Sequence, residues 1–584
     1  MMEDYFHVRA FNGLIQRSQW DRFETRLEKN TLRALDLLDK FDIKATFFVL
    51  GWIADKQPEL IREIARRGHE LASRGLYQRS TRRMTPDEFR DDLSRSRGAV
   101  ERASETKVFG YRASRGWSSL EDLWALEILA EQGYAYDSSV VPLARAFNRE
   151  PWRCFAHQHQ VGEKQIWEIP ISTSSFLGWR VPIAGGNYIR QFPHTLLKHA
   201  VERWHKTYNA PFVMYAHIWE LDPEQPRISG ASLLTRIRHY RNLDKMAGIL
   251  EDYFRKYLFI GMADYLGLRI QDGSPHAARP HGMQSDTNGS LEKRRPVLHV
   301  SSNGKSHVDP DGSKAPRLSV SIIVPCFNEE LILPYLANTL KSVKTALSSN
   351  YELYFIFVDD GSSDRTAETL QRLFGSWSNC AFLHHEKNLG VAASILDGIR
   401  HAETEIVCSI DCDCTYDPHE LSKMIPLLAE GISLVTASPY HPQGRVRNVP
   451  RWRLSLSRGA SFLYRHVLRN KLSTYTSCFR VYRRQAVVDL RLRKNGFLGI
   501  AEMLGRLDLQ GARIVEYPAV LEVRLFGRSK MKVLRTVAGH LRLLGSLLAM
   551  RLRAGGSLRD QKLPRKANCE GLYLDIQIRD RKGY

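Results

Sequence analysis

Ser409-Ile410-Asp411-Cys412-Asp413 is the stretch around which the second half of the chain is organised. The residues before the aspartates, 405–410, are apolar and β-branched enough to predict a buried strand. Carboxylates at the carboxyl end of a strand in an open α/β sheet face the ligand crevice, and their oxygens suit Mg²⁺ or Mn²⁺. The alternative is that Asp411 and Asp413 only cap a turn at the strand end.

Three further strand patterns lead up to this stretch, each separated from the next by a helix pattern. The strands are expected at 319–325, 354–358 and 381–383, and one helix at 365–374. This β-α-β-α-β-α-β order, with polar residues after the strands, predicts a doubly wound sheet that binds a nucleotide. No Gly-x-Gly-x-x-Gly or Gly-Lys-Ser/Thr occurs, which disfavours a dinucleotide or P-loop site.

Length and composition predict a soluble, multidomain protein. A chain of 584 residues is too long for one core, and 43% hydrophobic with 26% charged residues is typical of globular domains. Eight scattered cysteines favour a reducing compartment, and neither a signal-peptide pattern nor an 18-residue apolar run is present. The net charge of +21 favours phosphorylated substrates or anionic lipid. No nucleic-acid partner is expected, because zinc-finger spacing and aromatic RNA-binding signatures are lacking.

Composition divides the chain into four parts. Residues 1–267 alternate helix and strand patterns, with strands expected at 45–49 and 212–217 and a helix at 58–67. Residues 268–317 are polar and predict a flexible linker before the domain at 318–532. In the basic tail, 533–584, the segment 533–553 predicts an interfacial amphipathic helix, and a core-packing helix is the alternative.

The second half resembles the family 2 inverting glycosyltransferases, and among them the polyprenyl-phosphate (dolichyl-phosphate-like) mannosyltransferases. Six segments in the right order carry the resemblance: 324–330, 358–362, 411–413, 452–459, 476–480 and 524–530. It implies a Rossmann-like nucleotide-diphospho-sugar transferase domain of the GT-A type. The family also implies Mg²⁺ or Mn²⁺, a nucleotide-diphosphate sugar donor, and a polyprenyl phosphate or glycan acceptor.

The resemblance also assigns site residues. Asp411 and Asp413 would hold the metal against the donor diphosphate, and Arg524 and Lys530 would clamp phosphate oxygens. Glu502 would lie where relatives with hydroxyl acceptors keep a catalytic base, although a surface carboxylate is the alternative. The nucleotide-sugar would be bound by Pro325, Phe327, Glu329, Asp359, Asp360, Asp411 and Ser529. The acceptor phosphate would meet Arg453, Ser457 and Arg458, unless these arginines only form a solvated basic face.

The first half resembles the polysaccharide deacetylase family, in its exopolysaccharide-associated branch. The matching segments are 2–8, 45–48, 68–73, 110–113, 136–139 and 217–220. The resemblance implies a distorted (β/α) barrel and metal-assisted removal of N-acetyl groups. Residues matching the family's site motifs are Glu3, Asp4, His69, Arg112 and His217, and His217 alone could equally be a hydrogen-bonded core histidine.

The deacetylase metal site is altered. The family's two histidines fall on Arg74 and Gln78, and its catalytic aspartate falls on Met1; its first strand is also incomplete. Arginine is a permanent cation and cannot ligate a metal, so we do not expect Zn²⁺ in this half.

Together these patterns predict a bacterial inverting glycosyltransferase of cell-envelope or exopolysaccharide synthesis, fused to an inactive deacetylase-like domain. Two alternatives remain: a bifunctional enzyme that also deacetylates an amino sugar, and a non-catalytic glycan-binding assembly protein. A cytoplasmic protein bound peripherally to the inner face of an anionic membrane is expected from the basic tail.

Overall fold

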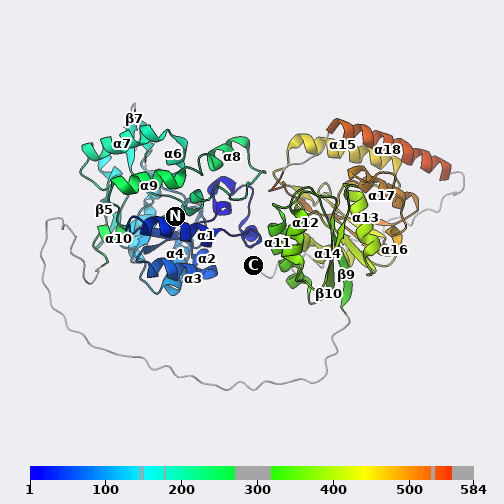
Figure 1. Ribbon diagram of the computed structural model, residues 1–584, viewed down its shortest axis with the longest axis horizontal. Coiled ribbons are helices and arrows are strands. Elements are labelled where there is room, and N and C mark those ends of the chain that lie inside the picture. The colour runs from blue at the N-terminus through cyan, green and yellow to red at the C-terminus, as the bar shows by residue number, and fades with distance from the viewer. Residues whose placement is uncertain are drawn as a thin grey trace, which may run out of the picture. The chain divides into compact units, whose positions relative to one another are not determined.

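The structure is a computed structural model and describes residues 1–143, 147, 150–176, 179–183, 185–269, 317–527 and 533–554. The chain divides into two compact units, Met1–Pro316 and Arg317–Tyr584, each with its own α/β core (Figure 1). Most of the expected linker and the last thirty residues lie outside the described residues.

Unit 1 is built on a six-stranded sheet. Its strand order is β1-β2-β3-β4-β6-β5, and only the β5–β6 pair is antiparallel. The strands are β1 (Thr46–Val49), β2 (Glu70–Ser73), β3 (Gly110–Tyr111), β4 (Tyr136–Asp137), β5 (His157–Val161) and β6 (Lys164–Glu168). Within the described part of unit 1 this sheet does not close, so the expected barrel is an open sheet with β1 and β5 at its edges.

Helices flank the sheet of unit 1 and bury their apolar faces in one core. They include α1 (Leu27–Asp39), α2 (Gly51–Lys56), α3 (Pro58–Arg66), α4 (Pro86–Ser104), α5 (Trp124–Glu131) and α9 (Met246–Lys256). In α4, Thr85 accepts from the Glu88 amide and Glu88 accepts from the Thr85 amide, which is a capping box. The strand expected at 212–217 does not form a strand of the sheet: it makes an isolated bridge from Tyr215 to Gly185, and its Ala216 carbonyl accepts from the Met1 nitrogen at 2.8 Å.

Unit 2 is built on a seven-stranded sheet in the order β11-β10-β9-β12-β15-β13-β16. Its strands are β9 (Leu318–Cys326), β10 (Tyr351–Asp359), β11 (Cys380–His384), β12 (Ile406–Ser409), β13 (Leu434–Ser438), β15 (Arg480–Arg483) and β16 (Ile514–Pro518). All neighbours are parallel except around β15. In the sheet, β10 and β11 lie on one side of β9, and the next strand in the chain, β12, lies on the other side. A topological switch point therefore lies between β9 and β12.

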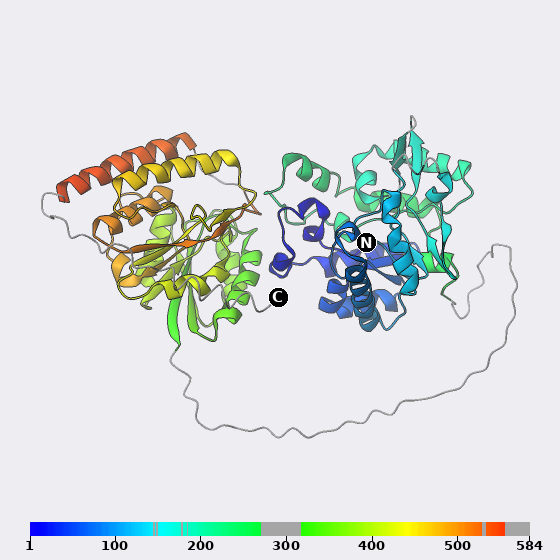
Figure 2. The same cartoon turned by 180° about the vertical axis from the view of Figure 1, so that it is seen from behind.

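Helices cover both faces of this sheet, and two of them form a separate layer. α11 (Leu333–Leu347), α12 (Thr366–Phe374), α13 (Val391–His401) and α17 (Phe497–Leu509) flank the strands. α15 (Arg451–Val467) and α18 (Val533–Ala554) lie side by side, as both views show (Figures 1 and 2). No helix of the described residues combines the length and apolarity needed to cross a membrane.

Candidate functional site

Two loops that follow β9 and β12 bring acidic residues together at the switch point of unit 2. Asp411 and Asp413 follow β12, and the side chain of Cys412 between them contacts Cys326 at the end of β9, with 3.7 Å between the sulfurs. Cys414 adopts a left-handed φ of 51°, which turns the chain directly after Asp413. The two aspartates therefore lie at the carboxyl edge of the sheet, where a ligand crevice is expected.

The Arg524 guanidinium joins two of these loops. It forms an ion pair with Glu329 from the β9 loop and lies 3.6 Å, Nη1 to Oδ2, from Asp413. Its Nε also donates to the Phe526 carbonyl at 2.7 Å, which fixes the plane of the fork. Glu329, Asp413 and Arg524, which together span almost 200 residues of sequence, thus form one charged cluster.

This cluster has the chemistry of a cation site. Burial, and after it the charge of Asp413, raise the pKa of Asp411 to about 7. Two close carboxylates favour a bound cation, and hard oxygen ligands suit Mg²⁺ or Mn²⁺. Among the described residues no group of three or more His, Cys, Asp or Glu could hold a metal alone. The residues present therefore fit an ion that takes its remaining ligands from water or from a bound diphosphate.

A second pair of carboxylates, Asp359 and Asp360, lies at the end of the neighbouring strand β10. Asp359, the last residue of β10, accepts from the Ser362 amide at 3.2 Å and from His384 Nδ1 at 2.9 Å. Asp360 accepts from the Leu389 and Gly390 amides at 2.8 and 2.7 Å, so it holds the loop that precedes α13. Both side chains are almost fully buried and are held by partners at this strand end.

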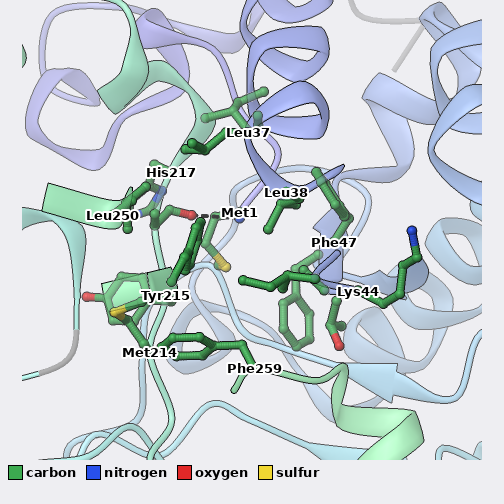
Figure 3. Close-up of a pocket in the computed structure, with 18 of the residues that line it drawn as sticks. Met1, Leu37, Leu38, Lys44, Phe47, Met214, Tyr215, His217, Leu250 and Phe259 are labelled. Atoms are coloured by element: carbon green, nitrogen blue, oxygen red, sulfur yellow. Dashed lines mark hydrogen bonds between the residues drawn. The ribbon is translucent and has the colours of Figure 1, made fainter. Parts of the chain in front are cut away.

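In unit 1 the buried carboxylate of Glu3 contacts the side chains that stand where the resemblance places the family's metal ligands. Arg74 Nη1 lies 2.7 Å from Glu3 Oε2, and Gln78 Nε2 donates to the same oxygen at 2.6 Å. His217 Nδ1 lies 2.5 Å from Oε1, and His217 also lines a pocket of this unit (Figure 3). Burial alone would raise the pKa of Glu3, but the Arg74 and His217 partners hold it well below its ordinary value. A guanidinium thus neutralises the carboxylate, and these residues do not fit a zinc ion.

Three family models match the chain. The model of glycosyl transferase family 2 matches residues 321–491, that of polysaccharide deacetylase matches 19–136, and that of a domain of unknown function, DUF3473, matches 138–267. The chain carries a family 2 glycosyl transferase domain and a polysaccharide deacetylase domain. The resemblances inferred from the sequence are confirmed.

Two curated relatives each match less than two fifths of this chain. A dolichol-phosphate mannosyltransferase of Pyrococcus furiosus is 28% identical over 38% of this chain and 62% of its own length. A polyprenol monophosphomannose synthase of Mycolicibacterium smegmatis is 28% identical over 36% of this chain and 80% of its own. A glucosyl-3-phosphoglycerate synthase of Mycobacterium tuberculosis, solved with Mn²⁺ and UDP, is 21% identical, covers 42% of this chain and 83% of that one, and superposes with a TM-score of 0.30.

Within the transferase domain, the predicted acceptor residues lie on α15. Arg458 is exposed and its guanidinium lies 5.2 Å from the Tyr440 ring. Arg453 is half-buried, with its guanidinium 5.2 Å from the ring of the exposed Trp452, and Ser457 is half-buried one turn further on. No ion pair or hydrogen bond within the described residues links these three side chains to the Asp413 cluster.

Glu502 has a different role from the one predicted. Its side chain is buried on α17 and accepts from the amides of Arg493 and Lys494 at 2.8–3.0 Å and from Arg506. Both carboxylate oxygens are therefore taken up by donors of the loop before α17 and of α17 itself. These contacts argue against a catalytic base and for a residue that holds the loop before α17.

Other predicted positions are less engaged in the transferase site. Pro325 and Phe327 are half-buried where β9 ends, beside the crevice. Ser529 and Lys530 lie outside the described residues. His384 and His385, which pair with Asp359 and Asp360, were missed by the sequence reasoning. The sequence could have indicated both histidines, because they directly follow the third predicted strand and so lie at the same edge of the sheet.

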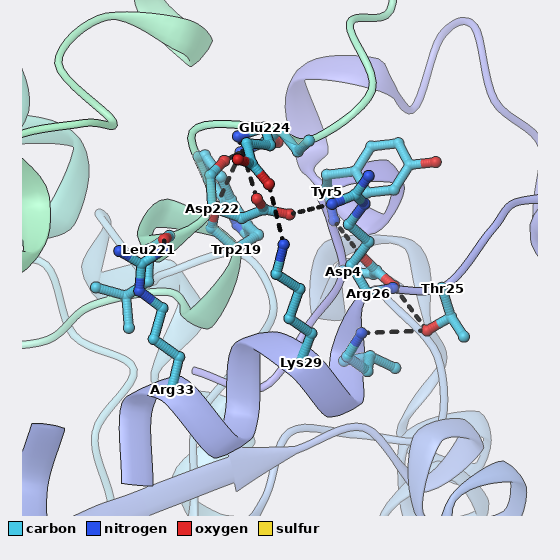
Figure 4. Close-up of polar contacts among 12 residues, drawn as sticks. Asp4, Tyr5, Thr25, Arg26, Lys29, Arg33, Trp219, Leu221, Asp222 and Glu224 are labelled. Atoms are coloured by element: carbon cyan, nitrogen blue, oxygen red, sulfur yellow. Dashed lines mark hydrogen bonds and ion pairs between the residues drawn. The ribbon is translucent and has the colours of Figure 1, made fainter. Parts of the chain in front are cut away.

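The remaining matched residues of the deacetylase domain are mostly structural. Asp4 accepts from the Tyr5 and Arg26 amides and the Thr25 hydroxyl, and burial raises its pKa to about 6 (Figure 4). His69 Nδ1 accepts from the Ala45 amide at 3.2 Å, and burial lowers its pKa to about 4. The buried Arg112 donates to the Ser138 hydroxyl at 2.8 Å. Asp4 and His69 therefore hold loops and strands in place.

Proposed function

We propose that unit 2 is an inverting glycosyltransferase that moves a sugar from a nucleotide-diphosphate sugar to a polyprenyl phosphate or a growing glycan. The observation that carries this proposal is the convergence of Asp411, Asp413 and Arg524 at the sheet's switch point. Carboxylates for a cation and a fixed guanidinium are what the departure of a nucleoside diphosphate requires. The family match and the polyprenyl-phosphate transferases among the relatives support the same chemistry.

The roles of the residues follow from their chemistry. Asp411 and Asp413 would hold Mg²⁺ or Mn²⁺, and such an ion would offset the charge that develops on the leaving diphosphate. Arg524 exchanges its carboxylate partners for phosphate oxygens when the donor binds, and Lys530 adds a second cation. Asp359, with Pro325, Phe327 and Glu329, surrounds the nucleoside, and Ser529 joins the phosphate contacts. Arg453, Ser457 and Arg458 receive the acceptor phosphate.

The acceptor chemistry agrees with the structural role of Glu502. A phosphate monoester already carries negative charge near neutral pH, so its attack on the sugar needs no strong base. A hydroxyl acceptor would need one, and the carboxylate of Glu502 is committed to Arg506 and to two backbone amides. This favours a phosphate acceptor over a glycan hydroxyl.

The proposal also covers the location of the protein and the activity of the deacetylase domain. An acceptor on a lipid would bring the protein to the inner face of an anionic membrane, where α15 and α18 supply exposed apolar and basic side chains. The deacetylase domain lacks hydrolase activity, because Arg74 and Gln78 bond to Glu3 in place of a metal. The bifunctional and purely glycan-binding alternatives have no comparable observation in their favour.

A donor and acceptor panel tests the proposal. Wild type is incubated with Mn²⁺, a set of nucleotide sugars and short polyprenyl phosphates, and Asp413→Ala is expected to lower transfer by about 100-fold or more. The exposed Asp489→Ala in the same unit is the matched control and should leave transfer unchanged. Equal transfer by Asp413→Ala and wild type, or no transfer with any donor, would refute the assignment.

A further inference from the structure

Two thiols are in contact where β9 and β12 end. Cys326 is the last residue of β9, and Cys412 follows β12 between Asp411 and Asp413. Their sulfurs lie 3.7 Å apart, and the two residues are only 1% and 5% exposed. Every described cysteine is free, so the contact is a reduced dithiol. This pair therefore stands directly beside the carboxylates proposed to bind the metal ion.

The pairing of the two strands fixes this contact. β9 and β12 run parallel with Ser409 opposite Ile323, and Cys412 and Cys326 each lie three residues further along. The Ile410 amide continues the ladder by donating to the Ile323 carbonyl at 3.1 Å. Neighbouring strands are about 4.8 Å apart, and disulfides join Cα atoms about 4.4–6.8 Å apart. A disulfide can thus bridge these two positions without separating the strands.

The two cysteines are anchored unequally. The Cys326 carbonyl accepts from the Asp360 amide at 2.8 Å, which holds Cys326 within the sheet. Cys412 lies in a turn that is closed by the Cys414 amide, which donates to the Asp411 carbonyl at 3.1 Å. Bond formation would bring the sulfurs from 3.7 Å to about 2.0 Å, so the turn, rather than the strand, is the part that gives way.

Proximity rather than acidity favours a reaction between these thiols. Contact with the Cys326 thiol, and after it burial, raise the pKa of Cys412 well above its ordinary value, so the nucleophilic thiolate is scarce. Cys412 is the more accessible of the two, because Asp411 and Asp413 on either side of it are half-buried. Once Cys412 is oxidised, its partner is already in contact with it. Oxidation is therefore expected to be slow and to select this pair.

We propose that Cys326 and Cys412 form a modification site for hydroperoxides and that their disulfide weakens metal binding by the transferase, a second step that rests on the proposed function. The Cys412 sulfur attacks one peroxide oxygen, water leaves, and a sulfenic acid forms. The Cys326 sulfur then displaces the hydroxyl of the sulfenic acid as a second water, and the S–S bond forms. Two thiols and one hydrogen peroxide thus give one disulfide and two waters, with both sulfurs oxidised and the peroxide reduced.

Weaker metal binding follows from the position of Cys412 in the turn. Asp411 and Asp413 flank it, and a divalent ion requires its oxygen ligands at well-defined positions. Displacing the turn moves both carboxylates together, and reduction of the disulfide lets them return. Disulfides in a reducing compartment are usually transient and redox-sensing, which agrees with a reversible change at this site.

Peptide mapping of the full chain tests the modification site. The reduced protein is treated with hydrogen peroxide, its remaining thiols are blocked, and trypsin then releases the peptides 318–341 and 401–423. Mass spectrometry should find these two peptides joined, and Cys412→Ser should abolish the link. Cys380→Ser, at a half-buried cysteine of β11, is the matched control and should keep it. Absence of the link, or a link made through Cys414, would overturn the proposal.

A Mn²⁺ titration of the same samples tests the effect on metal binding. Peroxide should weaken Mn²⁺ binding by wild type about tenfold or more, and dithiothreitol should restore it. Cys326→Ser and Cys326→Ala should each bind Mn²⁺ equally before and after peroxide. Equal affinity of the linked and the reduced wild type would overturn the second step.

The two measurements also separate this inference from the proposed function. A reduced chain that binds no Mn²⁺ would overturn the proposed metal site, and the effect of the disulfide on it would fall as well. A chain that binds Mn²⁺ but forms no link between Cys326 and Cys412 would overturn the modification site alone.

Discussion

The Glu3 cluster shows how one substituted side chain changes the chemistry of a site. Arg74 and Glu3 are both almost fully buried, and Gln78 and His217 complete the shell of the carboxylate. Exchanging an imidazole for a guanidinium replaces a metal ligand by a cation that forms the charge pair itself. The guanidinium at position 74 thus gives the buried Glu3 carboxylate a charge partner within the fold.

Arg74→Met should strongly destabilise unit 1. Removing one partner of a buried ion pair leaves Glu3 uncompensated, and the expected loss is about 3–5 kcal/mol of unfolding free energy. Calorimetric unfolding of the full chain measures it. Arg102→Met is the matched control, because Arg102 is 70% exposed and its pair with Asp55 should contribute less than about 1 kcal/mol. A loss as small as that of the control would contradict the buried pair.

His7 should make the stability of unit 1 depend on pH. Its ring is fully buried between Phe6, Trp20 and Trp52, and burial lowers its pKa to about 3. The unfolded chain binds a proton below an ordinary histidine pKa while the folded chain does not, so stability is lost as pH falls from about 6.5 toward 3. At pH 5 this amounts to ~2 kcal/mol.

The measurement compares wild type with His7→Gln. The difference in unfolding free energy between them should shift against wild type as pH falls from 7 to 5. Exposed His199→Gln serves as the control and should give a flat difference. A flat difference for His7→Gln as well would mean that the ring is protonated in the fold.

At the scale of elements, α18 is amphipathic in the way that its sequence predicted, and it uses both faces. Leu543, Leu544 and Leu547 are buried in the core of unit 2, and Gly505 of α17 lets Leu547 approach closely. The opposite face exposes Leu541 and Leu552. The core-packing alternative therefore describes the buried face, and contact of the exposed face with a membrane stays a prediction.

The α15–α18 layer should bind anionic lipid. Trp452 and Phe462 on α15, with Leu541 and Leu552 on α18, are 49–71% exposed, and arginines lie among them. Replacing all four by serine should weaken binding to vesicles containing phosphatidylglycerol by about tenfold or more. Serine at four exposed leucines of unit 1, Leu196, Leu233, Leu234 and Leu258, is the matched control. Equal binding by both variants in a sedimentation assay would exclude this layer as the contact.

At the scale of the whole molecule, the proposed function assigns catalysis to unit 2 alone. The full chain should take up no stoichiometric Zn²⁺ through Glu3, His217 and their neighbours, and should release no acetate from N-acetylated glycans above background. The reason is the Arg74 guanidinium, which satisfies Glu3 in place of a metal. Elemental analysis and an acetate assay check this, with Asp413→Ala as a variant that should alter neither result. One zinc per chain together with turnover would restore the bifunctional interpretation.

Much of the fold followed from local patterns. The four predicted strands of unit 2, β9 to β12, begin and end within a few residues of their predicted runs, because buried parallel strands are nearly continuous apolar segments. The helix at Pro58–Arg66 matches its predicted range almost to the residue. The 212–217 segment has the same kind of sequence, yet it forms only an isolated bridge at Tyr215 and no strand ladder. Strand formation depends on a neighbouring strand, which the local sequence does not reveal.

The sequence by itself determined the two α/β units, the acidic strand ends and the presence of Arg74 and Gln78 after the deacetylase motif at 68–73, because these depend on residue type and short-range order. Only the tertiary structure decided what each charge contacts: Arg524 bridges Glu329 and Asp413, and Glu502 faces Arg506 and two amides. Such pairings join residues far apart in the chain, and their geometry is fixed by packing rather than by any local pattern.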